Sequence, residues 1–153
     1  MESRYLRIDA SICTGCRICE LTCAICHDKV NNPKKGRLRA YRTEVLDYVI
    51  ACRHCSDPPC AKPCPTKAIY KTDNGMTVVD RKKCIGCKEC VEACPFGAMF
   101  FDPDRNQAMN CDLCGACIDA CPVHCMAITT GDKMASKIGT DYITKITGTP
   151  IIT

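Results

Sequence analysis

The sequence predicts an α+β protein in which small β-hairpins and short helices surround cysteine-rich loops. Three observations predict this fold. Cysteine accounts for 18 of the 153 residues, a density typical of chains held together by disulfides or metals. The cysteines recur in four similarly spaced groups, and strand-like runs alternate with turns between these groups. The chain has no tryptophan and three phenylalanines, so ordinary apolar side chains alone would give a thin core.

The start of the chain favours metals over disulfides. Residues 1–9 contain neither the apolar stretch nor the twin arginine of an export signal. No segment approaches the roughly 18 apolar residues of a membrane span. We therefore expect a cytoplasmic protein without a membrane anchor. Disulfide frameworks belong mostly to secreted proteins, whereas the same cysteine density inside a cell indicates metal ligands.

Four motifs contain sixteen of the cysteines. In motifs I, III and IV, two residues separate each of the first three cysteines and three residues precede the fourth. Motif II has four residues between its second and third cysteines, and a proline follows the fourth cysteine in motifs II, III and IV. The motifs are Cys13, Cys16, Cys19, Cys23 (I); Cys52, Cys55, Cys60, Cys64 (II); Cys84, Cys87, Cys90, Cys94 (III); and Cys111, Cys114, Cys117, Cys121 (IV).

This spacing is typical of cubane iron–sulfur clusters. Three closely spaced cysteines wrap one cluster, and the fourth turns away to ligate a neighbouring cluster. We expect the fourth cysteine to lie on a short helix, which the following proline ends, and Gly15, Gly86 and Gly115 to let the loops bend tightly. Structural zinc sites instead use paired cysteine knuckles or cysteine and histidine pairs, which this pattern fits poorly. We therefore expect sixteen iron ligands and four [4Fe–4S] clusters.

The segments between the motifs predict hairpins and outer strands. Residues 68–71 and 76–79 flank a glycine-containing turn, and residues 98–101 and 107–109 flank a second turn at 102–104. Residues 5–8 before motif I and 126–128 after motif IV are candidate outer strands. The repeating unit is therefore a strand, a cluster loop, a short helix and a strand.

Clusters change the meaning of the net charge. An oxidised cluster with four thiolates carries about −2, so four clusters would turn the formal charge of +4 into about −4. The basic side chains then partly balance the cofactors. Few aromatic residues are present to stack on bases, and we expect no nucleic-acid partner.

Motifs II and III together resemble a complete bacterial two-cluster ferredoxin, and motifs I and IV flank it. This order resembles the four-cluster iron–sulfur subunits of the DMSO reductase family. The pattern Cys-x-His-Cys-x2-Pro-Pro-Cys-x3-Cys-Pro at residues 52–65 is a specific match to their second motif, and the resemblance covers residues 5–130. Motif IV departs from many relatives because it lacks a long insertion, and motif I lacks the proline, having Ala24.

The resemblance implies two pseudo-symmetric ferredoxin-like modules, one nested within the other. The outer module would contain residues 1–30 and 96–130, the inner module residues 45–95, and residues 131–153 would form a partner-binding or flexible tail. The implied ligand sets are Cys13, Cys16, Cys19 with Cys121; Cys111, Cys114, Cys117 with Cys23; Cys52, Cys55, Cys60 with Cys94; and Cys84, Cys87, Cys90 with Cys64. The competing assignment pairs motif I with II and motif III with IV.

The resemblance also implies a function. The chain would be a non-catalytic electron-transfer subunit of an anaerobic oxidoreductase complex. It would relay single electrons between a larger tungsten or molybdenum subunit and another electron carrier or flavoprotein. Motif I and the residues after it look most like the small subunits of tungsten aldehyde oxidoreductase or carbon monoxide dehydrogenase systems. Alternatives are a free-standing polyferredoxin, the equivalent subunit of a formate dehydrogenase or hydrogenase, and an enzyme or sensor with an open iron site, against which four complete quartets argue.

Several residues have two interpretations. Cys26 and Cys125 are either reserve ligands or redox thiols, or small buried apolar residues, which we favour because free cysteine is commonly buried. His54 either donates a hydrogen bond to a cluster sulfur or packs in the fold. The basic residues Lys34, Lys35, Arg37, Arg39 and Arg42 either dock an acidic partner or form a solvated loop.

Overall fold

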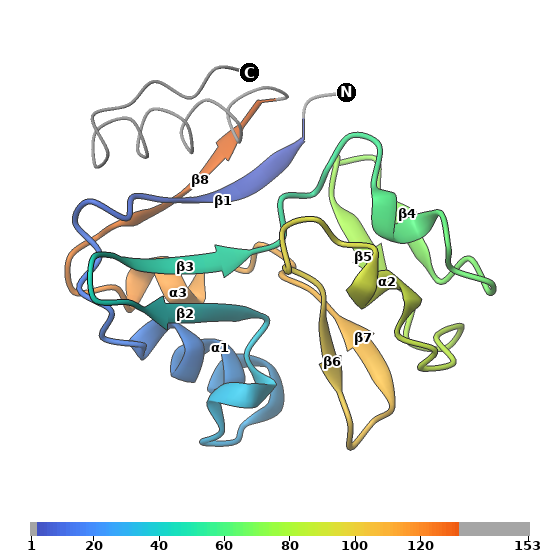
Figure 1. Cartoon of the computed structure of the whole chain (residues 1–153), viewed down its shortest axis with the longest axis horizontal. Coiled ribbons are helices and arrows are strands. Elements are labelled where there is room, and N and C mark those ends of the chain that lie inside the picture. Colours follow the sequence, from blue (N-terminus) through green and yellow to red (C-terminus); the bar gives the residue numbers. More distant parts are fainter. Residues whose placement is uncertain (1–2, 132–153) are drawn as a thin grey trace.

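The computed structural model describes residues 3–131. Its elements in chain order are β1 (Arg4–Ile8), α1 (Ile18–Asp28), the 3₁₀ helix η1 (Pro33–Lys35), β2 (Leu38–Arg42), β3 (Asp47–Ala51), the 3₁₀ helix η2 (Pro59–Ala61), β4 (Ile69–Lys71), β5 (Thr77–Val79), α2 (Glu89–Glu92), β6 (Phe100–Asp102), β7 (Gln107–Met109), α3 (Ala116–Asp119) and β8 (Met126–Thr130) (Figure 1). Apart from Gly131, the predicted tail at 131–153 lies outside the described residues.

Within the described part of the chain, the strands form four two-stranded antiparallel sheets. β1 pairs with β8, from Arg4 opposite Thr130 to Ile8 opposite Met126, so the beginning and the end of the described chain lie side by side (Figure 1). The other sheets are the hairpins β2–β3, β4–β5 and β6–β7. The predicted α+β class, the two hairpins after motifs II and III and both outer strands are confirmed.

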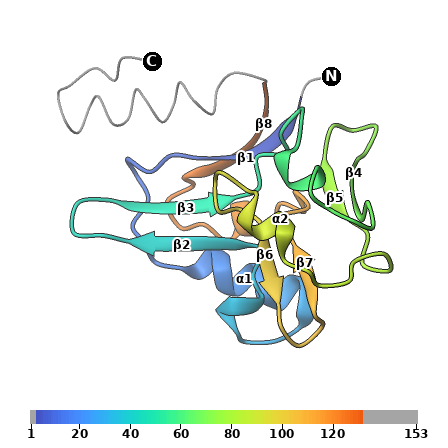
Figure 2. The ribbon, with the colours of Figure 1, turned by 45° about the vertical axis from the view of Figure 1, so that its right-hand side comes forward.

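The hairpin β2–β3 was not predicted as a pair. Burial alternates along β2: Leu38 and Ala40 are buried, Arg39 between them is partly buried, and Tyr41 is exposed. Its turn contains neither glycine nor proline, the usual turn signals. Instead the hydroxyl of Thr43 donates to Leu46 O at 2.6 Å and accepts from Leu46 N–H at 2.9 Å. Figure 2 shows this hairpin on the opposite side of the molecule from β4–β5.

Two hydrophobic clusters form the core. One contains residues from both ends of the described part of the chain and from β2–β3, and the other lies around β4, α2 and β6–β7. The first contains Leu6, Cys19, Cys23, Leu38, Ala40, Val49, Ala51, Cys52, Cys111, Cys117, Cys121, Cys125 and Met126. The second contains Cys60, Ile69, Cys90, Met99 and Ala108. Cysteines are prominent in both, so the motifs themselves form much of the core.

The helices differ from the prediction. The fourth cysteine lies on a helix only in motif I, where Cys23 is inside α1. In the other motifs the helix carries the third cysteine and ends before the fourth. The residue before a proline is disfavoured in the helical conformation, and Pro65, Pro95 and Pro122 follow those fourth cysteines. Motif I has Ala24 instead, and its helix continues to Asp28.

Among the described residues, no helix has the length and apolar character needed to cross a membrane.

Candidate iron–sulfur sites

Four cavities of similar size lie among the cysteine motifs. Each contains about 300 to 340 Å³ of space, including its opening to solvent, and is lined by cysteines from two motifs. We name each cavity after the first cysteine of the motif that supplies three residues. The sets are Cys13, Cys16, Cys19 and Cys121 (Cys13 site); Cys52, Cys55, Cys60 and Cys94 (Cys52 site); Cys84, Cys87, Cys90 and Cys64 (Cys84 site); and Cys111, Cys114, Cys117 and Cys23 (Cys111 site).

The structure thus brings the sixteen cysteines together in the four groups that the resemblance implied. Motifs I and IV exchange their fourth cysteines, and so do motifs II and III. Among these four cavities, none combines motif I with motif II or motif III with motif IV.

A left-handed turn inside each loop helps to shape the site. The second residue after the first cysteine has positive φ in every motif, with values of 61° at Gly15, 48° at His54, 75° at Gly86 and 59° at Leu113. This conformation costs non-glycine residues about 1–2 kcal/mol. In motifs II and IV it aims the backbone N–H at the first cysteine, because His54 donates to Cys52 Sγ at 3.5 Å and Leu113 to Cys111 Sγ at 3.4 Å.

The fourth cysteines also accept backbone hydrogen bonds. Ala68 N–H donates to Cys64 Sγ at 3.3 Å, and Ala98 N–H donates to Cys94 Sγ at 3.4 Å. Burial opposes ionisation of Cys64, but the donors around its sulfur, led by Ala68, outweigh burial and hold the pKa of Cys64 below its usual value. Such donors stabilise a thiolate, which is the form that binds iron.

The third cysteine of every motif is buried. Burial, assisted mainly by neighbouring cysteines, raises the pKa of Cys19, Cys60 and Cys117 to about 12 and that of Cys90 to about 11. These thiols are protonated at neutral pH without metal, so metal binding must release their protons. Four sulfur donors facing an apolar cavity with N–H groups nearby fit a [4Fe–4S] cluster, for which thiolates are the usual ligands.

His54 is fully buried, in agreement with its interpretation as a packing residue. Its Nδ1 accepts the N–H of Thr77 at 2.9 Å, which leaves the proton of the neutral ring on Nε2. Burial first, and then the charge of Lys71, lower the pKa of His54 to about 4. The residues that the structure describes provide no partner for Nε2. It is the backbone N–H of His54, not its ring, that donates to Cys52.

The two extra cysteines have different environments. Cys125 is 4% exposed and lies 3.5 Å from Cys121, sulfur to sulfur, so its predicted burial is confirmed. Cys26 is exposed on α1, and the prediction of burial is wrong for this residue.

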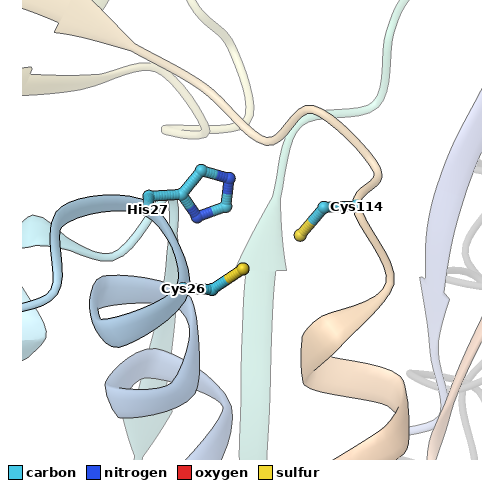
Figure 3. Close-up of side chains that lie close together, drawn as sticks. All are labelled: Cys26, His27 and Cys114. Atoms are coloured by element: carbon cyan, nitrogen blue, oxygen red, sulfur yellow. The ribbon is translucent and has the colours of Figure 1, made fainter.

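Ligand atoms of Cys26, His27 and Cys114 lie within 4.8 Å of one another, between α1 and the loop before α3 (Figure 3). Because Cys114 belongs to the Cys111 site, a separate ion there would compete with a cluster.

Most of the basic residues considered for partner docking form contacts within the chain. Lys35 pairs with Asp102 at 2.5 Å and Asp104 at 2.6 Å, and Arg37 pairs with Asp112 at 2.5 Å. Arg39 donates to the carbonyl oxygens of four residues around η1, Pro33, Lys34, Gly36 and Leu38. Their charges therefore stabilise the fold around α1 and η1.

Residues 44–137 match the 4Fe–4S dicluster domain family. The chain belongs to this family. Together with the relatives described next, the match confirms the prediction of an iron–sulfur electron-transfer protein related to the iron–sulfur subunits of the DMSO reductase family. The relatives include the putative electron transport protein YsaA of Escherichia coli K12, which is 38% identical over 120 residues, or 72% of this chain and 76% of YsaA.

Other relatives are a reductase subunit and an electron transport protein. One subunit of the anaerobic dimethyl sulfoxide reductase of Escherichia coli K12 is 37% identical over 119 residues, 69% of this chain and 58% of that subunit. The electron transport protein HydN of the same organism is 39% identical over 104 residues, 63% of this chain and 59% of HydN. This chain therefore spans less than two thirds of the length of these two relatives.

The fold also matches a solved structure. A chain of the active-site complex BamBC of benzoyl-coenzyme A reductase, as isolated, superposes with a TM-score of 0.51 and 23% identity. The match covers 95% of this chain and 91% of that chain. At this identity the likeness shows a shared fold.

Proposed function

We propose that the chain is a subunit that holds four [4Fe–4S] clusters and relays single electrons between a catalytic oxidoreductase subunit and a second redox protein. The observation that carries this proposal is the presence of four cavities, each lined by four motif cysteines in the crossed pattern of two-cluster ferredoxins, with Cys125 also lining the Cys13 site. Each cluster, when bound, would accept and return one electron. The chain supplies the thiolates, the N–H groups aimed at them and the surrounding apolar walls.

We also propose the nested arrangement of modules, with the Cys52 and Cys84 sites inside and the Cys13 and Cys111 sites outside. The pairing of β1 with β8, which brings the segments before motif I and after motif IV together, supports it. The sites would then form a chain of carriers with motifs I and IV at one end and motifs II and III at the other. Electrons would enter at one end and leave at the other.

The proposed catalytic partner is a larger tungsten or molybdenum subunit, with tungsten aldehyde oxidoreductase as the first candidate. The similarity to a subunit of dimethyl sulfoxide reductase supports an assembly of this general kind. The similarity to the putative electron transport protein YsaA supports an electron carrier and does not distinguish a subunit from the alternative of a free-standing polyferredoxin.

Co-purification tests the proposed assembly. The chain, tagged and purified without oxygen from its own host, should bring down a larger chain that contains tungsten or molybdenum, measured by mass spectrometry and metal analysis. Expressed alone, it should be poorly soluble. A stable, fully loaded monomer without any partner would contradict the subunit proposal and support the free-standing carrier.

A further inference from the structure

We propose that Asn110 couples the inner and outer modules: its side chain tunes the cluster at the Cys52 site, and its backbone leads directly to the Cys111 site. This inference rests on the proposed function, because it assumes that both sites hold clusters. It adds a positioning residue, outside the sixteen cysteines, to the electron path through the protein.

The contacts of Asn110 connect two sites. Its Nδ2 group donates to Cys52 Sγ at 3.4 Å and to the backbone oxygen of Thr77 at 2.7 Å. A side-chain amide has two N–H bonds, so both hydrogen bonds form at once and fix the orientation of the amide. Asn110 is 7% exposed, so water has little access to compete for these bonds.

The position of Asn110 in the fold explains how it reaches both sites. It follows β7 directly, and the next residue is Cys111, the first cysteine of the Cys111 site. Cys52 directly follows β3, and Thr77 begins β5. Figure 1 shows that the ends of β3 and β7 approach each other near the centre of the molecule. One hydrogen bond, the Asn110 side chain and one peptide bond therefore connect a thiolate at the Cys52 site to Cys111.

This contact differs from the other hydrogen bonds to cysteine sulfur. In the described part of the chain, Cys23 and Cys84 also accept hydrogen bonds from other segments, but there the donors are the backbone N–H groups of Arg37 and Ala108. Asn110 is the one side-chain amide in residues 3–131 that donates to a cysteine sulfur. A neutral donor stabilises the more negative, reduced state of a cluster, so hydrogen bonds to sulfur help to set the reduction potential.

The direct test is Asn110→Leu in the full chain, purified anaerobically with any partner that it retains. Leucine has a similar size but cannot donate. The reduction potential of the Cys52 cluster, followed by electron paramagnetic resonance, should shift to a more negative value, and the other potentials should stay in place. Electron transfer between the inner and outer clusters should slow several-fold in a rapid freeze-quench experiment. The signal of the Cys52 cluster is identified by its perturbation in Cys55→Ser.

The matched control is Gln107→Leu. It removes a β7 amide that donates to the backbone oxygen of Arg81 at 2.6 Å instead of to a cysteine sulfur. This variant should leave both the potentials and the transfer rate unchanged. Equal shifts in Asn110→Leu and Gln107→Leu would assign the effect to the strand and overturn the inference.

A second measurement uses the unaltered protein and does not depend on the folding of a variant. With ¹⁵N in the asparagine side chains, the reduced Cys52 cluster should show a magnetic coupling to one ¹⁵N nucleus. Absence of this coupling, or an unchanged reduction potential of the Cys52 cluster in fully loaded Asn110→Leu, would overturn this inference. The proposed function would still stand. A protein without a cluster at the Cys52 site would instead overturn the proposed function, and this inference with it.

Discussion

Glu20 is a buried carboxylate that connects α1 to the hairpin β2–β3. It is 1% exposed, its Oε1 accepts the N–H of Ala40 at 2.8 Å, and its Oε2 pairs with Arg17 at 3.0 Å. It lies beside Cys19 in sequence, so it holds the helix that carries cysteines of both outer sites against the neighbouring hairpin.

Replacement of this carboxylate should destabilise the outer sites. Glu20→Ala leaves the buried N–H of Ala40 without its acceptor, which typically costs about 1–3 kcal/mol. We expect the visible absorbance of the clusters to bleach at a lower temperature or denaturant concentration. Glu20→Gln keeps a hydrogen-bond acceptor for Ala40, so it should lose less stability than Glu20→Ala. Glu44→Ala, at an exposed position of the β2–β3 turn, is the control, and an equal loss there would contradict this role.

Substitutions at two glycines distinguish the free-energy cost of a positive φ from the free-energy cost of steric crowding. Gly86 and Gly97 have φ values of 75° and 60°. A Cβ at Gly86 would lie 2.5 Å from the carbonyl oxygen of Asn106, whereas a Cβ at Gly97 would meet nothing within 4 Å. Gly97→Ala should therefore cost only the backbone strain, about 1–2 kcal/mol.

Gly86→Ala should lower the stability of the protein by more than Gly97→Ala does, and it should affect the Cys84 site. Its Cβ would force the loop away from Asn106, because a backbone oxygen cannot move aside as a flexible side chain can. Iron analysis after mild heating should show a greater loss from Gly86→Ala than from Gly97→Ala. Similar losses from the two variants would show that crowding at Gly86 is unimportant.

At the scale of elements, proline decides where the helices end. α1 runs on past Cys23 to Asp28, while α2 and α3 each end before their fourth cysteine. The sequence contains this difference in Ala24, which replaces the proline of the other motifs. The continued helix places His27 against the Cys111 site, where its Nε2 contacts Asp112 at 2.9 Å.

Ala24→Pro tests the importance of this continuation. A proline inside a helix removes a hydrogen bond and clashes with the preceding turn, at a cost of about 3 kcal/mol or more. The Cys13 and Cys111 sites should therefore lose iron, while the two inner sites keep theirs. Ala24→Gly retains the backbone N–H and should cost nearer 1 kcal/mol. If the proline variant retained all of its iron, the length of α1 would not support the sites.

The sequence predicted elements wherever the local signal was strong. The hairpin β4–β5 has a glycine in its turn, and β1 and β8 flank the outer motifs. The pair β2–β3 was missed because its turn depends on Thr43, a residue with no strong turn preference. The predicted helix positions were wrong because a proline disfavours the helical conformation of the residue before it, and Cys64, Cys94 and Cys121 each precede a proline.

The candidate sites were predictable in part. The motif spacing and the resemblance together indicated the four groups of cysteines. The contact between Asn110 and Cys52 was not predictable, because 58 positions separate the two residues and asparagine next to a motif carries no spacing signal. The exposure of Cys26 was also not predictable. It depends on which face of α1 packs against the core, and the length of α1 determines that face.

At the scale of the whole molecule, the proposed crossed pairing would connect motif I with motif IV and motif II with motif III through shared clusters. Cys64→Ala should perturb the cluster of the Cys84 site, because Cys64 lines that cavity, and leave the cluster of the Cys52 site intact. Cys60→Ala, in the same motif, should do the reverse. Electron paramagnetic resonance spectra of the two variants distinguish the outcomes. If Cys64→Ala instead altered the Cys52 cluster, the crossed assignment would be wrong.

The number of clusters is the central claim, and iron and sulfide analysis tests it most directly. With four iron atoms and four sulfides per cluster, anaerobically purified protein should contain about 16 of each per chain. The four cysteine quartets and their similar cavities lead us to expect full occupancy. A reproducible content of about 12 iron atoms and 12 sulfides in fully reconstituted protein would show that one quartet holds no cluster and would contradict the account.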